Sequence, residues 1–196
     1  MKKTTLTILM TFILFASGYA QSNEGVFGST YKLVKGYSKV PSDGIYLIAG
    51  YLSEDSGGSL YLMSSDSLNN GEIKGKLYTK VTTDAPPATI VLDESSYSTK
   101  IPGLEYRFLY QETEKKERKF SILNNGRYLT NVSNSEIEFQ DTRTDNSLWI
   151  LKDATPDYYR IRFYNNDYKI AFYTQTKALK IAISTTNSPD INLYRK

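Results

Sequence analysis

Cysteine and histidine are both absent from the 196-residue chain, and tryptophan occurs once. Without Cys or His the chain cannot form a Ser-His-Asp or Cys-His catalytic pair, perform thiol redox chemistry or bind zinc through these ligands. The lack of Cys also excludes disulfide bonds and a lipid-modified Cys behind an export signal. We therefore predict no cofactor, no metal site, no catalytic residues and no lipoprotein anchor.

A strong excess of one charge sign is missing as well, since 24 Lys and Arg stand against 21 Asp and Glu. Basic residues do not cluster in the way that a nucleic-acid binder requires, so we expect no nucleic-acid partner. The densest charge run, residues 112–119 (ETEKKERK), mixes both signs and is typical of a solvated hairpin tip. After residue 20 no apolar run approaches the 18 residues of a membrane span, so none is expected in the mature chain.

The first twenty residues have the pattern of an export signal. Lys2 and Lys3 precede an apolar run from Leu6 to Phe15, and mostly small residues lead to a predicted cleavage after Ala20. An uncleaved anchor helix is the alternative, but the apolar run is short for a membrane span. We predict a signal peptide at residues 1–20, a flexible leader at 21–30 and a single domain at 31–196. The protein would then be exported to the periplasm, the cell surface or the extracellular space.

After this segment, apolar residues do not recur at helical spacing. Short runs rich in Tyr, Ile, Val, Phe and Thr alternate with Gly, Asn, Asp, Ser and Pro, which indicates strands and turns. The triplets at residues 69–71 (NNG), 124–126 (NNG) and 165–167 (NND) favour tight hairpins, because Asn and Gly tolerate positive φ. An all-β fold is therefore predicted. The expected strands are residues 31–35, 45–51, 59–63, 76–81, 89–93, 106–110, 119–123, 127–132, 136–140, 147–152, 159–164, 168–173, 178–183 and 190–194.

Internal repetition gives a more specific prediction. The runs KFSILNNGRYLTN, EIEFQ and SLWILKD correspond to the later runs YYRIRFYNNDYKIAFYT, ALKIAIS and DINLYRK. A weaker copy, made of IYLIAGY, SLYLM, KLYTKV and TIVLD, precedes them. These three units of four strands resemble a β-trefoil, which implies a barrel of three four-strand repeats, with the strands at 31–35 and 106–110 left over. Another closed β-barrel or a sandwich is the alternative.

The runs YKLV, GIYLI, GRYL, WIL and INLY, in this order, also resemble a module common in secreted Bacteroidota proteins. That resemblance implies export and a β-trefoil-like fold. Ricin-type sugar-binding trefoils carry Gln-x-Trp near the end of each repeat, and the similar stretch here is Ser147-Leu148-Trp149, with no Trp in the other two repeats. Because Trp149 lies in an apolar run, we expect it in the core.

Paired carboxylates are the remaining acid–base candidates, namely Glu136/Glu138, Asp141/Asp145, Asp153/Asp157 and Asp93/Glu94. Each pair lies at a strand end or in a turn, where Asp and Glu commonly serve solubility or capping. Glu136 and Glu138 are expected on the solvent face of a strand whose inward residue is Ile137. We therefore predict that the protein is not an enzyme and rank a carboxylate-based glycosidase last.

A non-catalytic binding module with a carbohydrate ligand is the favoured function. Tyrosine offers a flat face with a polar tip, which suits sugar rings and protein surfaces. The alternative is a protein-binding domain such as a protease inhibitor, whose contact loop would be residues 84–89 (DAPPAT) or 97–103 (YSTKIPG), because Pro stiffens a loop. The partner is thus a glycan or an extracellular protein. The candidate ligand-binding residues are Tyr164, Asn165, Asn166, Asp167, Tyr173 and Gln175.

Overall fold

The computed structural model of the protein describes residues 28–34, 43–93, 103–111, 119–133, 136–155, 158–163, 168–183 and 191–196. The predicted signal peptide and most of the predicted leader lie outside these residues. The described part is built from β-strands joined by turns, with one short 3-10 turn at Asp145–Ser147. The all-β prediction is confirmed, and in this part of the chain no helix is long and apolar enough to cross a membrane.

All fourteen predicted strands are present, but the strand predicted at 59–63 extends six residues beyond its predicted end and the strand predicted at 76–81 begins four residues before its predicted start. They are β1 (Ser29–Leu33), β2 (Gly44–Glu54), β3 (Gly57–Asn69), β4 (Glu72–Val81), β5 (Thr89–Leu92), β6 (Glu105–Gln111), β7 (Lys119–Asn124), β8 (Arg127–Ser133), β9 (Glu136–Gln140), β10 (Leu148–Thr155), β11 (Tyr158–Phe163), β12 (Tyr168–Tyr173), β13 (Ala178–Ile183) and β14 (Ile191–Arg195).

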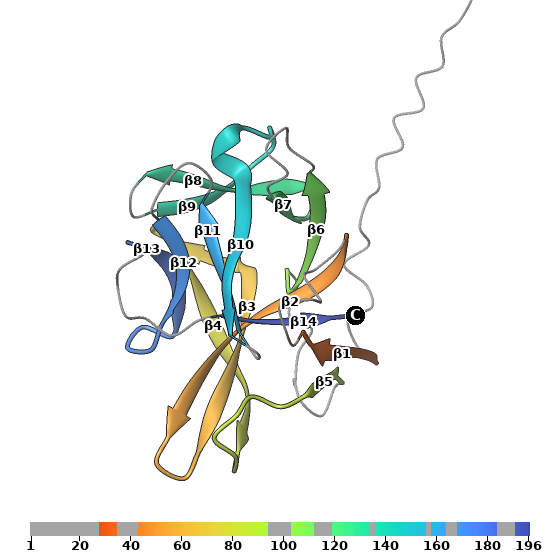
Figure 1. The fold of residues 1–196 in the computed structure, drawn as a ribbon, viewed down its shortest axis with the longest axis vertical. Helices are drawn as coiled ribbons and strands as arrows, with labels where there is room; N and C mark the ends of the chain where they lie inside the picture. Colours follow the sequence, from red (N-terminus) through yellow and green to blue (C-terminus); the bar gives the residue numbers. More distant parts are fainter. Residues whose placement is uncertain are drawn as a thin grey trace, which may run out of the picture.

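The strands form one antiparallel sheet whose neighbours follow the order β5-β1-β14-β11-β12-β13-β4-β3-β2-β6-β7-β8-β9. Strand β10 pairs with both β7 and β11, and β14 pairs with β2 in addition to its neighbours in that order. Figure 1 shows the β8–β9 hairpin at one end of the molecule and the β2–β3 hairpin protruding at the other.

The pairing changes the assignment of two strands. The sequence pattern placed residues 89–93 in the first repeat and left 106–110 over, but β5 pairs with β1 whereas β6 pairs with β2 and β7. Hydrophobicity alone could not reveal this, because both strands alternate in the same way. In β5, Ile90 and Leu92 are buried between exposed Thr89 and Val91.

Two hydrophobic clusters share β2, which explains its run of six buried residues. Tyr46 and Ile48 belong to the main cluster, whereas Leu47, Ala49 and Tyr51 face a second cluster that contains residues of β1 and β5. Successive side chains of a strand point to opposite faces, so a strand covered on both faces reads as a continuous apolar run. The strands β1 and β5 thus cover the face of β2 that the main cluster leaves open.

Trp149 lies in the main cluster with 1% of its side chain exposed, as predicted. Its indole Nε1–H donates a hydrogen bond of 2.8 Å to the Leu129 carbonyl, so the polar atom of this large side chain is satisfied. The ring therefore ties β10 to β8 across the core. A stacking role for this Trp at the surface is excluded by its burial.

Two of the predicted tight turns have the expected backbone. Asn70 and Gly71 join β3 to β4 with φ of 49° and 74°, and Asn125 and Gly126 join β7 to β8 with φ of 50° and 77°. Positive φ at both central residues is the type I′ arrangement that suits the twist of a hairpin. The third predicted turn, at residues 165–167, lies outside the described residues.

Candidate functional site

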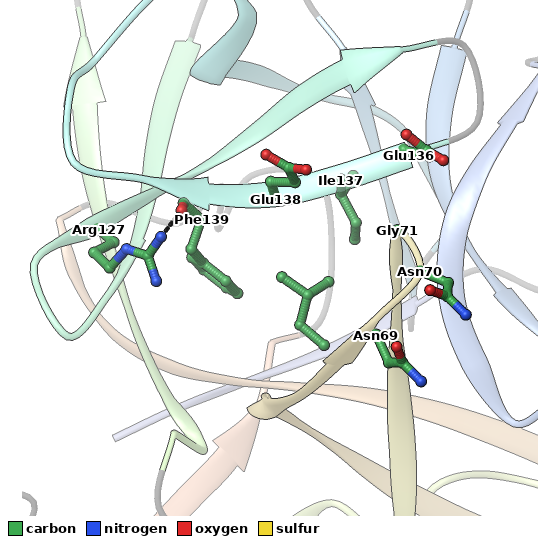
Figure 2. A pocket seen from close by; sticks show the side chains of 9 residues that line it. Asn69, Asn70, Gly71, Arg127, Glu136, Ile137, Glu138 and Phe139 are labelled. Atoms are coloured by element: carbon green, nitrogen blue, oxygen red, sulfur yellow. Dashed lines mark hydrogen bonds between the residues drawn. The ribbon is translucent and has the colours of Figure 1, made fainter.

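A polar cleft lies between the β3–β4 turn and β9, with a volume of about 430 Å³. This volume falls within the range of small-molecule sites. The two sides come from segments more than sixty residues apart in the sequence, and Figure 2 shows them facing each other. The lining residues are Leu68, Asn69, Asn70, Gly71, Arg127, Glu136, Ile137, Glu138 and Phe139.

The Asn70-Gly71 turn fixes one side of the cleft. The Ile137 backbone N–H donates a 3.3 Å hydrogen bond to the Gly71 carbonyl, which joins the turn to β9. Glycine is required here for space as well as for its φ of 74°, since a Cβ at this position would lie 2.6 Å from Glu136 Cγ and 2.8 Å from Glu136 Cα. The tight turn therefore sets how closely the two walls approach.

Alternation along β9 separates the apolar and the charged side chains. Ile137 is fully buried and Phe139 is 6% exposed, while Glu136 and Glu138 are exposed, as the sequence predicted. Figure 2 shows Ile137 and Phe139 directed toward the β3–β4 turn and the two carboxylates on the other side of the strand. Leu68 is thus the apolar lining residue with exposed surface, and the carboxylate acceptors of β9 lie on the outer side of the strand.

Arg127 closes the end of the cleft at the start of β8. Its Nε lies 3.1 Å from Asp141 Oδ1, and its Nη2 donates to the Phe139 carbonyl. More than half of this side chain is exposed, so the ion pair with Asp141 adds little to stability but does orient the guanidinium. Part of the guanidinium remains open to solvent as a donor.

The chemistry of these groups is recognition by hydrogen bonding. Carboxylates accept, amides donate and accept, and a guanidinium donates, so together they match ligands that carry hydroxyl groups. Within the described residues, no group of three or more Asp or Glu side chains is placed to hold a metal ion.

Four of the six candidate residues from the sequence, Tyr164 and residues 165–167, lie outside the described residues. Their role therefore stays a prediction. They connect β11 to β12, whereas Tyr173 ends β12 and Gln175 lies in the turn after it. With a rise of about 3.3 Å per residue, the six-residue strand places Tyr168 and Tyr173 about 17 Å apart. Tyr173 thus lies at the C-terminal end of β12 and Gln175 just beyond it.

Tyr173 is partly exposed and Gln175 is exposed, but the Tyr173 ring already has a cationic neighbour. Lys180 Nζ lies 5.6 Å from the ring centroid and 2.9 Å from Glu72 Oε2. A cation held over one ring face competes with a sugar for that face. Among the described residues, Tyr173 is therefore a weaker stacking platform than its sequence position suggested.

Half of the ten tyrosines whose burial the structure describes are inside the protein. Tyr31, Tyr46, Tyr106 and Tyr194 have no exposed surface and Tyr51 is 7% exposed, while Tyr110 is 42% exposed. The sequence analysis did not identify Asn69, Asn70 or Arg127 as site residues, because neither a turn motif nor the first residue of a strand shows which distant segment will lie beside it.

No protein-family model matches this chain, and no curated protein matches it with significance.

Proposed function

We propose that the protein is a secreted, non-catalytic carbohydrate-binding module with a β-trefoil architecture, and that the sugar binds in the cleft between the β3–β4 turn and β9. The observation that carries this proposal is the cleft itself. Asparagine amides, a guanidinium and two glutamates line it, and Leu68 is its partly exposed apolar residue. A sugar ring has the complementary surface, with hydroxyl groups at its edge and C–H groups on its faces.

The trefoil architecture is supported by the order of the strand pairings. The pairs β2–β6, β6–β7, β7–β10, β10–β11, β11–β14 and β14–β2 form a circuit that returns to its first strand. The hairpins β3–β4, β8–β9 and β12–β13 remain outside that circuit. Six circuit strands and three outer hairpins are the parts that a barrel of three four-strand repeats requires.

Export is supported by the basic, apolar and small-residue segments within residues 1–20. A binding role rather than catalysis is supported by composition, since the chain has no His or Cys to act as a base or nucleophile. Binding through exposed amides and carboxylates needs neither residue.

The proposal is tested by binding the purified chain, from Gln21 onward, to an array of host and bacterial glycans. We expect saturable, competable binding that falls at least about tenfold in Asn70→Gly and in Glu138→Gln, because the first removes an amide and the second replaces an acceptor oxygen with an NH2 donor. Glycine retains the backbone freedom that φ of 49° requires at residue 70.

Asn125→Gly is the matched control. Asn125 occupies the same position of the same kind of turn, with φ of 50°, but does not line the cleft. Its substitution should leave binding unchanged. Loss of binding in Asn166→Ala and Asp167→Ala, with full binding in the two cleft variants, would place the site in the hairpin predicted from the sequence and refute the cleft. Hydrolysis of a bound glycan that disappears in Glu138→Gln would refute the non-catalytic role.

A further inference from the structure

The outer edge of β9 forms one wall of the cleft, and among the described strands β9 pairs only with β8. The Leu129 carbonyl, which lies opposite Phe139, accepts a hydrogen bond from the Trp149 indole rather than from β9. The Ile137 N–H donates to the Gly71 carbonyl at 3.3 Å, so it also points away from β8. Hydrogen-bonded and non-hydrogen-bonded pairs alternate along two antiparallel strands, so the N–H and C=O groups of Ile137 and Phe139 all face the β3–β4 turn.

Two of these four backbone groups already have partners within the protein. The Ile137 N–H is bonded to Gly71, and the Phe139 carbonyl accepts a hydrogen bond from Arg127 Nη2. The Ile137 carbonyl and the Phe139 N–H lie between them, with no partner among the described residues. An added peptide strand needs a longer row of open groups, whereas the hydroxyl groups of one sugar can donate to the carbonyl and accept from the N–H. The edge therefore favours a sugar over a peptide strand.

The two loops that the sequence analysis suggested for contact with a protein do not contribute to this wall. Residues 84–89 do not line the cleft, and residues 97–102 lie outside the described residues. The ligand of the cleft is therefore inferred from β9 and its neighbours alone.

Arg127 is the charged side chain that faces the cleft. Figure 2 shows its guanidinium on the same side of β9 as the Phe139 side chain, with the Glu136 and Glu138 carboxylates on the other side. Asp141 and the Phe139 carbonyl occupy two of the five N–H donors of the guanidinium, one at Nε and one at Nη2. Both hydrogens of Nη1 and the second hydrogen of Nη2 therefore remain for a ligand.

A carboxylate is the ligand group that matches these donors. Its two oxygens can each accept a hydrogen bond from the neighbouring Nη1 and Nη2, and such charge-assisted bonds are about twice as strong as neutral ones. Asp141 does not fill this position, because it contacts Nε and does not line the cleft. Its side chain is 88% exposed, so solvent screens its repulsion of an anionic ligand.

We propose that the sugar bound in the cleft carries a carboxylate, as uronic and sialic acids do, and that Arg127 holds this carboxylate. Hydroxyl groups of the same sugar bond to the Ile137 carbonyl and the Phe139 N–H, and the Asn70 amide faces the sugar from the opposite wall. This inference rests on the proposed carbohydrate site and names the class of its ligand. It assigns the preference for an acidic sugar to one side chain, so binding and preference can be measured separately.

Isothermal titration of the purified chain with two matched pairs of sugars tests the proposal. One pair is a galacturonic acid oligomer and its neutral methyl ester, and the other is sialyllactose and its methyl ester, so the two arms distinguish uronic from sialic acids. We expect the acid of at least one pair to bind at least about tenfold more tightly than its ester, because only the acid forms the charge-assisted contact. This preference should shrink as the salt concentration rises.

Substitutions of Arg127 separate its charge from its shape. Arg127→Gln should abolish the preference for the acid while the ester still binds, and Arg127→Lys should restore only part of it, because an ammonium lacks the planar fork of donors. Arg107→Gln is the matched control, since it removes the same charge from an exposed residue that does not line the cleft. It should leave the preference unchanged.

The outcomes distinguish this inference from the proposed function. Equal binding of acid and ester by the wild-type chain, with a neutral glycan still bound in the cleft, would overturn the inference and leave the proposed function standing. A preference that survives Arg127→Gln, or that Arg107→Gln also removes, would overturn it as well. A short peptide with a free C-terminal carboxylate that binds as tightly as the acidic sugar would show that no sugar is required. Absence of binding to every glycan would refute the carbohydrate site and this inference together.

Discussion

Two glycines in equivalent turns show how one missing Cβ sets the width of the candidate site. Gly71 and Gly126 have nearly the same backbone, with φ of 74° and 77°. A Cβ at Gly126 would have open space around it, whereas one at Gly71 would press against Glu136. Comparing substitutions at the two glycines therefore separates the free-energy cost of a left-handed backbone from the cost of a clash between the new Cβ and β9.

We expect Gly126→Ala to destabilise the protein by about 1 kcal/mol, the cost of a left-handed backbone for an L residue. Gly71→Ala should cost at least about 2 kcal/mol more, because the backbone of β9 must move away from the turn. Urea unfolding of both variants checks this. Equal losses would show that the turn and β9 are not in close contact.

The Trp149 side chain combines a large buried apolar ring with one buried hydrogen bond. In Trp149→Phe the Leu129 carbonyl loses its donor and part of the ring volume is left empty, so we expect a loss of about 2–4 kcal/mol. Urea unfolding followed by far-ultraviolet circular dichroism measures it, since the substitution removes the Trp fluorescence. Leu77→Ala, at a residue that is 43% exposed, is the control and should change stability by less than about 1 kcal/mol.

Several strands carry buried tyrosine side chains, and we therefore expect the stability of the protein to depend on pH in the alkaline range. Burial raises the pKa of Tyr31, Tyr106 and Tyr194 well above the ordinary value of 10.0. A hydrogen bond to Glu105 raises the pKa of Tyr31 further. The folded protein thus keeps protons that the unfolded chain loses above pH 10.

The stabilising contribution of these phenols is complete below pH 10 and is lost as the pH rises above it. We expect the free energy of unfolding to fall steeply above about pH 10, with the phenolate absorbance of these residues appearing only on unfolding. Parallel titrations of absorbance and circular dichroism check this. Ionisation of all tyrosines near pH 10 without unfolding would contradict the burial.

At the same scale, the sequence revealed the strands but not all of their partners. Alternation and Asn-Gly turns located each element, because these signals are local. The pairing of β5 with β1 and of β6 with β2 was not predicted, since two short strands with similar alternation do not show which neighbour they pair with. Strand pairing depends on contacts between residues that are distant in the sequence, and a local sequence pattern does not show these contacts.

The sequence analysis did not identify the cleft for the same reason, because the two sides of the cleft are distant in the sequence. Glu136 and Glu138 were identified as one exposed face, but Asn70 was read only as a turn residue. The hydrogen bond from Ile137 to the Gly71 carbonyl brings them together, and it exists only in the folded protein. The hydrogen bond from the Tyr194 hydroxyl to the Pro87 carbonyl shows this too, since the two residues are more than a hundred positions apart in the sequence.

For the molecule as a whole, the fold places the cleft at one end of the long strand β3. The cleft lies at its Asn69 end, whereas the exposed turn that follows β2 lies at its Gly57 end. Substitutions at the Gly57 end should therefore leave the cleft intact.

The central claim is that a sugar binds in the cleft, and an NMR titration of backbone amides tests it most directly. A glycan identified on the array is added to the ¹⁵N-labelled chain, and the shifts are mapped onto the sequence. We predict that the largest changes occur at residues 69–71, at 136–139 and at Arg127. Saturable changes centred on other residues, with these amides unmoved, would contradict the account.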